Sequence, residues 1–173
     1  MLSGLIEDCR NLPGIEPHTL ASEFCTADLP AIVHRARPGK GWLKSFAESL
    51  GQVDGVLIVA PEFDGILETL TSQVEKSQAL LLGCSSQAIA TSADKWSCGR
   101  VWEAQGIPTP PSVLVHASHL PFPPPYLAFP LVLKLRDGAG SLATVLIPDA
   151  ASWPQAVSAV SAERPGGQWL AQP

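Results

Sequence analysis

Charged side chains are scarce in this sequence, and basic ones are the scarcer kind. Only 16% of the 173 residues are charged, and eleven lysines and arginines are scattered singly among sixteen acidic residues, for a formal net charge of -5. A surface that binds nucleic acid needs basic residues grouped together to neutralise the phosphates. We therefore expect no nucleic-acid partner. With 46% hydrophobic residues, a surface so short of charge indicates neighbours that cover part of it.

The chain also lacks the signals of a membrane, secreted or zinc-binding protein. No apolar run approaches the roughly 20 residues that cross a bilayer, and Glu7, Asp8 and Arg10 stand where a signal peptide would be apolar. The four cysteines lie far apart, without a Cys-x-x-Cys pair. Because a chain without a signal peptide stays in a reducing compartment, we expect reduced thiols, no membrane partner and a cytoplasmic location.

Short apolar runs alternate with segments of helical spacing over the first 106 residues. Val53 to Ala60, reading VDGVLIVA, is rich in β-branched residues and predicts a buried parallel strand. Further strands are expected at 15–20, 31–36 and 79–82, helices at 1–11, 42–50, 65–76, 86–91 and 94–105, and a turn at 38–41. This alternation predicts an α/β fold in which helices cover a parallel sheet and ligands bind at the carboxyl ends of the strands.

The composition changes after Gly106, where we place a domain boundary. Prolines at 108, 110 and 111, and again at 121, 123, 124 and 125, interrupt regular structure. We interpret the second cluster as a stiff surface loop rather than as a polyproline ligand for a partner. Strands are expected at 112–116, 130–135, 142–147 and 168–172, and a helix at 152–160. These residues predict a second, smaller domain.

The segment FPLVLKLRDGAGSLATVLI, residues 129–147, places a lysine inside an apolar strand just before a glycine-bearing turn. Burying the ammonium of Lys134 is unfavourable unless an anion meets it. Gly138 and Gly140 let backbone amides approach an oxyanion, and Ser141 adds a hydroxyl donor. One interpretation is a phosphate-binding hairpin. The other is a plain hairpin with an exposed edge lysine, since Lys134 alternates with leucines. The segment has neither P-loop spacing nor a Gly-x-Gly-x-x-Gly turn.

Several segments, in order along the chain, resemble the ATP-grasp superfamily. LLGCSSQAIATSADKWSCGRVWEAQGIPTPPSVLV, residues 81–115, is similar to the approach to that fold. The resemblance implies that Lys95, in the Asp-Lys pair, contacts the nucleotide phosphates; without it, Lys95 reads as a solvated helix lysine. FPLVLKLRDGAGS resembles the family's strand lysine and flexible glycine loop, which implies Lys134 as a phosphate ligand and 137–141 as the loop. QWLAQP is similar to the strand entering the adenine hinge and implies that Gln172 lies beside the base.

The same resemblance implies a domain organisation. Residues 1–106 would form a Rossmann-like pre-ATP-grasp domain with a parallel sheet. Residues 107–173 would form a linker and the first α+β subdomain of an ATP-grasp fold, truncated at its end. The opening MLSGLIEDCRNLPGIEPHTL is similar to a first helix and second strand, which would leave the initial strand of the sheet absent.

More narrowly, residues 53–89 resemble ligases of the tyramine-glutamate ligase type, whose Ala-Pro-Glu-x-Asp-Gly run is present as Ala60 to Gly65. Glu62 follows the strongest predicted strand and could position an amine or a catalytic lysine. The alternative is that Glu62 and Asp64 merely favour the dipole of the following helix.

Two remaining features are interpreted as structural. His116 and His119 lie on a proline-bounded loop without a carboxylate or cysteine to complete a tetrahedral set, so we expect no metal site there. The five tryptophans are expected to pack in the core or between lobes.

The resemblance implies a reaction in which ATP phosphorylates a carboxylate and an amine attacks the acyl phosphate, with Mg²⁺ offsetting charge on the phosphates. The family's metal ligands lie beyond the adenine hinge, so we expect them in a C-terminal half that residues 1–173 do not include. The expected function is thus the ATP-binding front portion of an ATP-dependent carboxylate-amine ligase, inactive alone. The alternative is a nucleotide-binding or interaction module that acts with a second subunit.

Overall fold

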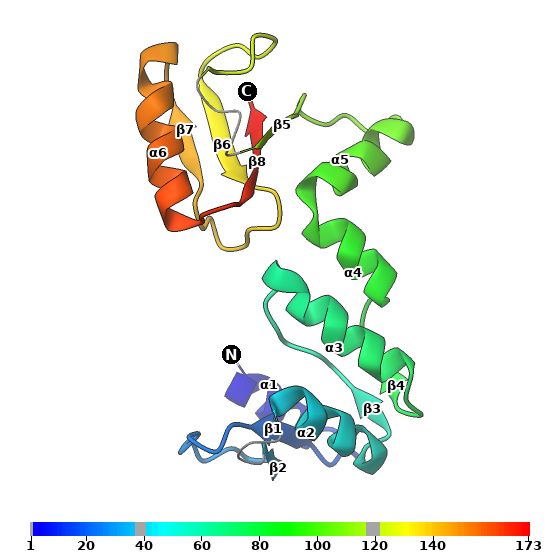
Figure 1. Ribbon diagram of the computed structural model, residues 1–173. Coiled ribbons are helices and arrows are strands. Elements are labelled where there is room, and N and C mark those ends of the chain that lie inside the picture. The colour runs from blue at the N-terminus through cyan, green and yellow to red at the C-terminus, as the bar shows by residue number, and fades with distance from the viewer. Residues whose placement is uncertain (1, 37–40, 117–121) are drawn as a thin grey trace. The chain divides into compact units, whose positions relative to one another are not determined.

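Helices and short parallel strands alternate through the first half of the chain, and an antiparallel sheet follows (Figure 1). The computed structural model describes residues 2–36, 41–116 and 122–173. Contacts divide the chain into two compact units. The first unit comprises Met1–Ala60 and Leu67–Ser86, and the second comprises Pro61–Ile66 and Gln87–Pro173. This division rests on contacts, so the predicted domain boundary near Gly106 stays a prediction.

The first unit contains two parallel strand pairs joined by helices. Its elements are α1 (Leu2–Arg10), β1 (His18–Ala21), β2 (Ile32–Arg35), α2 (Trp42–Ser49), a 3-10 turn (Leu50–Gln52), β3 (Gly55–Val56), α3 (Ile66–Glu75) and β4 (Leu80–Leu81). β1 pairs with β2 and β3 pairs with β4, both in parallel. Residues 38–40 of the predicted turn at 38–41 lie outside the described residues.

The strand predicted over 53–60 is much shorter than expected. Only Gly55 and Val56 pair with β4, and Leu57 and Val59 are about half-exposed, at 50% and 49%. The expectation of a buried strand was therefore wrong for this segment. The β3–β4 sheet has two strands among the described residues, so no third strand covers the apolar side chains, which are usually buried in a larger parallel sheet.

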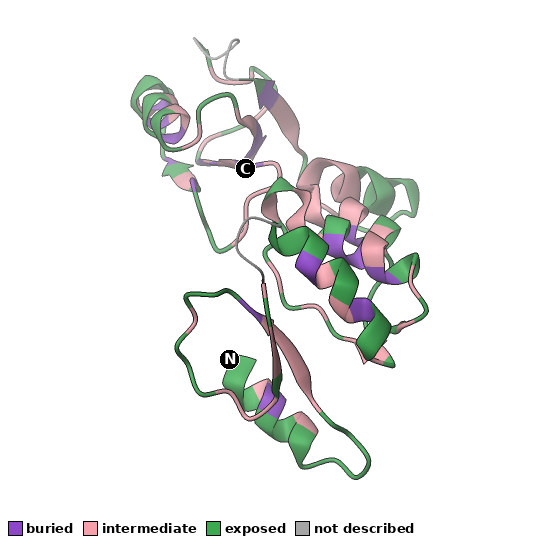
Figure 2. Ribbon diagram, turned by 60° about the horizontal axis from the view of Figure 1, so that its bottom comes forward, coloured by how far each residue is buried: buried purple, intermediate pink, exposed green. Residues whose placement is uncertain are grey.

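Buried residues of the first unit lie on several elements, and α3 carries more of them than any other element described (Figure 2). In α3, Leu70, Thr71 and Val74 are buried, at spacings of one, three and four residues that place them on one side of the helix. The helix begins after a 3-10 turn, Phe63–Gly65, in which Asp64 has a φ of 56° and Gly65 a φ of 66°. This left-handed pair ends the extended segment after β3 and allows the helix to start.

In its described residues, the second unit contains a four-stranded sheet and three α-helices. Its elements are α4 (Ser86–Ala93), α5 (Lys95–Ala104), β5 (Val113–His116), β6 (Leu131–Leu135), β7 (Val145–Ile147), a 3-10 turn (Ala150–Ser152), α6 (Trp153–Glu163) and β8 (Gln168–Gln172). The strand order is β5-β8-β6-β7, and every neighbouring pair is antiparallel. The helices and strands predicted for this half of the chain are confirmed, although β7 begins at Val145 instead of Leu142.

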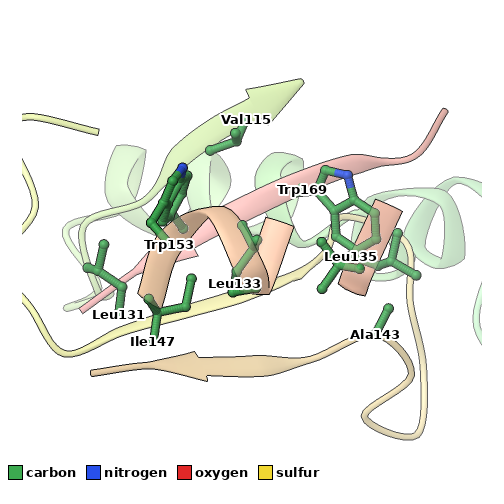
Figure 3. Packing of buried hydrophobic residues seen from close by; sticks show 11 residues of the cluster. Val115, Leu131, Leu133, Leu135, Ala143, Ile147, Trp153 and Trp169 are labelled. Carbon is green, nitrogen blue, oxygen red and sulfur yellow. The ribbon is translucent and has the colours of Figure 1, made fainter. Parts of the chain in front are cut away.

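The core of the second unit lies between α6 and one face of this sheet (Figure 3). Along β6, Leu131, Leu133 and Leu135 are buried, while Val132 and Lys134 between them are half-buried. Trp153 and Trp169 have no exposed surface. Each large side chain buried here contributes on the order of 1.5–3 kcal/mol through loss of apolar contact with water.

The five tryptophans were expected to pack in the core or between lobes. Two of them, Trp42 and Trp102, are nearly half-exposed and lie outside the core cluster. No helix in the described part of the chain combines the length and apolar character needed to cross a membrane.

Candidate functional site

β6 and β7 form the predicted hairpin, with Leu131 opposite Ile147 and Leu133 opposite Val145. The connecting loop is shaped by unusual backbone angles. Gly140, Ser141 and Ala143 all have a positive φ, of 63°, 62° and 46°. At Gly138, a Cβ atom would lie 2.7 Å from the Cβ of Leu135, so only glycine fits without movement of the strand. We call residues 136–144 the glycine loop.

Lys95, the first residue of α5, contacts this loop twice, although Gly138 is 43 residues away in the sequence. Its backbone N–H donates to the carbonyl oxygen of Arg136 over 3.0 Å. Its ammonium Nζ donates to the carbonyl oxygen of Gly138. The structure therefore brings together Lys95 and the glycine loop, which the resemblance had assigned to one phosphate site.

Lys134 lies close enough to Lys95 for their charges to interact. Burial, followed by the positive charge of Lys134, lowers the pKa of Lys95, while Asp137 and Glu62 oppose that shift. Two ammonium groups held near each other repel, and partial burial adds a desolvation cost. An anion that contacts both lysines would offset both costs. The surroundings of the two lysines thus fit a group with several negative charges, such as a polyphosphate.

Gly140 and Ser141 lie at the exposed part of the glycine loop. Their left-handed backbone turns the chain there, and Ala143 behind them donates its N–H to Glu163 Oε1 over 3.1 Å. The described contacts place neither Gly140 nor Ser141 against a lysine. Their predicted role in binding phosphate stays a prediction.

Gln172 lies on the same face of the sheet as Lys134. Residues directly opposite each other on neighbouring strands share a face. Lys134 is opposite Leu170, and Val132 is opposite Gln172. On the other side of β8, Leu114 is opposite Leu170. This face, turned away from α6, therefore carries a lysine, apolar side chains and an amide.

The amide of Gln172 is engaged within the protein. Its Nε2 donates to Oγ of Ser112 over 2.6 Å, and that hydroxyl in turn donates to the carbonyl oxygen of Pro110. Leu170, between the lysine and the amide along the face, has no exposed surface. A flat apolar ring could lie on this face only after neighbouring groups move, so the adenine assignment of Gln172 stays a prediction.

Glu62 lies in the loop between β3 and α3, in a segment, Pro61–Ile66, that belongs to the second unit. It occupies the N-cap position of the 3-10 turn without making a side-chain cap hydrogen bond. Its negative charge instead acts to raise the pKa of Lys95, and so opposes part of the larger lowering caused by burial and by Lys134. Asp64 in the same loop forms an ion pair with Arg164 at the end of α6.

Sequence reasoning missed an arginine next to these residues. Arg136 Nε donates to Asp94 Oδ1 over 2.7 Å and Nη2 donates to Asp94 Oδ2, a bidentate ion pair, while Nη1 donates to Gln168 Oε1 over 2.6 Å. Asp94 also caps α5 by accepting from the N–H groups of Trp96 and Ser97. The capping role could have been predicted from Asp94 preceding a helix, but nothing local indicated the arginine.

Electrostatics reinforce this pair. Burial alone would raise the pKa of Asp94, but the hydrogen bonds from Arg136 and Ser97 outweigh it and hold that pKa well below its usual range. The hydrogen bond to Asp94 likewise raises the pKa of Arg136. Both groups are therefore charged throughout the physiological range.

The described residues include no group of three or more His, Cys, Asp or Glu side chains that could hold a metal ion. His116 ends β5, and its predicted neighbour His119 lies outside the described residues. The expectation about that histidine pair therefore stays a prediction.

Solved structures share this arrangement of elements. L-amino acid ligase from Bacillus licheniformis matches with a TM-score of 0.69 and 20% identity, over 98% of this chain and 40% of that one. Biotin carboxylase from Campylobacter jejuni, solved as a β,γ-ATP complex, matches with a TM-score of 0.71 and 16% identity, over 92% and 40%. D-alanine-D-alanine ligase from Helicobacter pylori matches with a TM-score of 0.54 and 22% identity, over 64% and 33%. The chain therefore shares its fold with part of each of these proteins and spans well under half of their length.

The family comparison agrees with the fold. Residues 18–89 match the pre ATP-grasp 3 domain. No curated protein matches the sequence. The predicted resemblance to the ATP-grasp superfamily and the predicted fold class are both confirmed. The narrower resemblance to ligases of the tyramine-glutamate ligase type stays a prediction.

Proposed function

We propose that this chain is the ATP-binding front portion of an ATP-dependent ligase that joins a carboxylate to an amine. The observation that carries the proposal is the meeting of Lys95 and the glycine loop, with the charge of Lys134 acting on Lys95. A polyphosphate would take the place of the Gly138 carbonyl as the partner of the Lys95 ammonium. Bonds from charged donors to phosphate oxygens are among the stronger hydrogen bonds in proteins.

In this proposal the two lysines have separate roles. Lys134 projects from a rigid strand whose alternate residues are buried, so it offers a fixed positive charge. Lys95 stands at the first position of a helix, where the backbone dipole also favours an anion. The loop between them supplies backbone N–H groups, with Gly140 and Ser141 closing over the phosphates. The triphosphate of ATP is an anion of the kind that these residues would hold, and Mg²⁺ would enter with the phosphates and neutralise part of their charge.

The substrate part of the proposal rests on Glu62. Its charge acts on Lys95, so a cationic amine entering beside the phosphates would meet a carboxylate there. Acyl phosphate formation and amide synthesis would use groups that residues 1–173 do not supply, and we propose that the chain alone is inactive. An enzyme that consumes ATP in this way would work in the cytoplasm.

The binding proposal is tested by calorimetric titration of the chain with MgATP and with AMP. Replacing Lys95 or Lys134 by methionine should weaken MgATP binding about tenfold or more, since each removes a charged contact to phosphate. AMP binding should change little. Lys44→Met is the matched control, because Lys44 is exposed on α2 in the first unit. Equal affinity for MgATP in all variants would refute the phosphate site.

The inactivity proposal needs a separate assay. The purified chain is incubated with ATP, Mg²⁺, glutamate and an amine, and ADP release and amide formation are followed. We expect neither above the rate without protein. ATP-dependent amide formation by the 173-residue chain would overturn this part of the proposal and leave the binding part untouched.

A further inference from the structure

Arg136 joins three elements of the second unit. It follows the last residue of β6, and its backbone N–H donates to the carbonyl oxygen of Gln168, which extends the ladder toward β8. Its side chain holds Asp94 with two donors and Gln168 with a third. Its carbonyl oxygen accepts from the backbone N–H of Lys95. One residue thus fixes the end of β6, the start of β8 and the start of α5.

We propose that Arg136 is a positioning residue for the phosphate site, which through Asp94 and its own carbonyl holds the first turn of α5 so that Lys95 meets the glycine loop beside Lys134. The inference deepens the proposed function and depends on it only for the identity of the ligand as a phosphate group. The placement of Lys95 by Arg136 stands on the contacts alone.

The chemistry of the pair explains why an arginine is needed. A guanidinium presents several N–H donors in a rigid plane that matches both oxygens of a carboxylate. Arg136 uses that plane to bind Asp94 and Gln168 at once. A lysine at 136 would keep the charge but could not make the parallel pair and the third bond together. The Asp94 side chain would then be held to residue 136 by a single flexible contact.

Asp94 transmits this restraint to Lys95. Its carboxylate accepts from the backbone of Trp96 over 3.0 Å and of Ser97 over 3.2 Å, and from the Ser97 hydroxyl over 2.6 Å. Those capping bonds lie within α5 and do not require Arg136. Without the Arg136 side chain the helix should therefore remain folded, while its first turn keeps only the backbone bond from Lys95 to residue 136 and shifts more easily relative to the glycine loop. A purely structural pair would instead loosen the whole unit when broken.

The test measures the position of Lys95 without using a nucleotide. The intact chain is labelled with a trace of acetic anhydride, and peptide mass spectrometry gives the labelling rate of Lys95 relative to Lys44 and Lys76, which are exposed in the first unit. The variants are Arg136→Met and Arg136→Lys. The matched control is Arg100→Met, which removes an arginine from α5 that pairs with Glu103 and lies over the ring of Trp96.

We expect the relative labelling of Lys95 to rise about threefold or more in both Arg136 variants as its ammonium leaves the Gly138 carbonyl, and to stay near wild type in Arg100→Met. Circular dichroism should show unchanged helix content, and Arg136→Lys should keep more of the thermal stability than Arg136→Met. If Arg136→Met does not fold, Arg136→Lys decides. An unchanged Lys95 ratio, or an equal rise at Lys134 and every other lysine, would overturn the proposal.

Titration with MgATP then separates the two proposals. If the wild-type chain binds, both Arg136 variants should weaken binding about tenfold or more, and Arg100→Met by less than about twofold. Wild-type affinity in the Arg136 variants would overturn the positioning role. If the wild-type chain does not bind MgATP, the proposed function fails for this chain, while the labelling ratio still decides whether Arg136 positions Lys95.

Discussion

In the second unit four strands form one antiparallel sheet with α6 packed on one face, whereas the first unit divides four strands into two separate parallel pairs. The apolar side chains follow this difference. Leu131, Leu133 and Leu135 on β6 are buried, while Leu57 and Leu80 at β3 and β4 are 50% and 65% exposed. Segments with similarly apolar sequences therefore have opposite environments.

The comparison shows how strand connection controls burial. The β6–β7 hairpin closes through a single loop, and one helix covers the face that its leucines share. Parallel strands need a crossover for each pairing and helices on both faces before their apolar residues are buried. Stability in the first unit should therefore depend on α3, and stability in the second unit on the sheet core. The following predictions test that contrast.

The largest effect is expected at the sheet core. Trp169→Ala should lower the free energy of unfolding of the second unit by about 3–5 kcal/mol, because it leaves a cavity where a fully buried ring packs. Trp42→Ala, at a side chain 47% exposed on α2, should cost less than about 1 kcal/mol. Hydrogen exchange at increasing urea concentrations measures each unit separately. Equal costs at the two tryptophans would contradict the contrast.

A somewhat smaller effect is expected in the first unit. Leu70→Ala removes a side chain that is only 6% exposed on α3 and should cost about 2–5 kcal/mol there. Leu57→Ala, at a position 50% exposed, should change the stability by less than about 1 kcal/mol. The same exchange experiment compares them. A larger loss from Leu57→Ala would mean that the β3 segment, not α3, stabilises this unit.

The Asp94–Arg136 pair should make the second unit sensitive to acid. Because the pKa of Asp94 in the folded protein lies below the ordinary value of 3.8, its contribution is fully present above pH 3.8 and is lost as the pH falls below 3.8 and through the lower folded pKa. Asp94→Asn keeps a capping residue but not the ion pair, and should cost about 1–3 kcal/mol at pH 7. The variant should also flatten the pH dependence of stability below about pH 4.

The control for that prediction is Asp149→Asn. Asp149 also caps a turn, and its lowered pKa comes mainly from the backbone and hydroxyl donors of Ser152. Asp149→Asn should flatten the pH dependence of stability at acidic pH less than Asp94→Asn does. If stability falls with decreasing pH equally in the wild type and in Asp94→Asn, the ion pair does not contribute to stability.

The smallest effect concerns the backbone of the glycine loop. Ser141 is exposed and has a φ of 62°, which glycine adopts without strain. Ser141→Gly should therefore raise the stability of the second unit by up to about 1 kcal/mol, because relief of about 1–2 kcal/mol of left-handed strain exceeds the cost of about 0.5–1 kcal/mol from a more flexible unfolded chain. Ser141→Ala is the matched control, since it removes the hydroxyl but keeps the Cβ atom, and it should give no gain. A gain in both variants would point to the hydroxyl instead of the backbone angle.

Sequence patterns predicted much of the fold because most helices and strands have local causes. Apolar alternation predicted β6 and the outward direction of Lys134, and helical spacing predicted α3 and α6. The pattern failed at 53–60, where an apolar run predicted a buried strand and only Gly55 and Val56 pair. Such a run records a preference for burial, and the strand's neighbours decide whether burial occurs.

The candidate site was predicted in part. Lys95, Lys134 and Gly138 were assigned to one site from the resemblance, and the structure places Lys95 against Gly138 with the charge of Lys134 nearby. Gln172 shares a sheet face with Lys134, but its amide bonds Ser112. Arg136 was not predicted, because its partner Asp94 is 42 residues away and no local pattern links them.

By itself the sequence determined where most helices and strands form, which residue caps α5 and which turn requires glycine, since these depend on neighbouring residues along the chain. Only the tertiary structure decided that Asp94 meets Arg136, that Lys95 rests on the glycine loop and that the β3 segment stays exposed. Those outcomes depend on distances between remote segments, which are set when β6, β8 and α5 pack together and which no local preference contains.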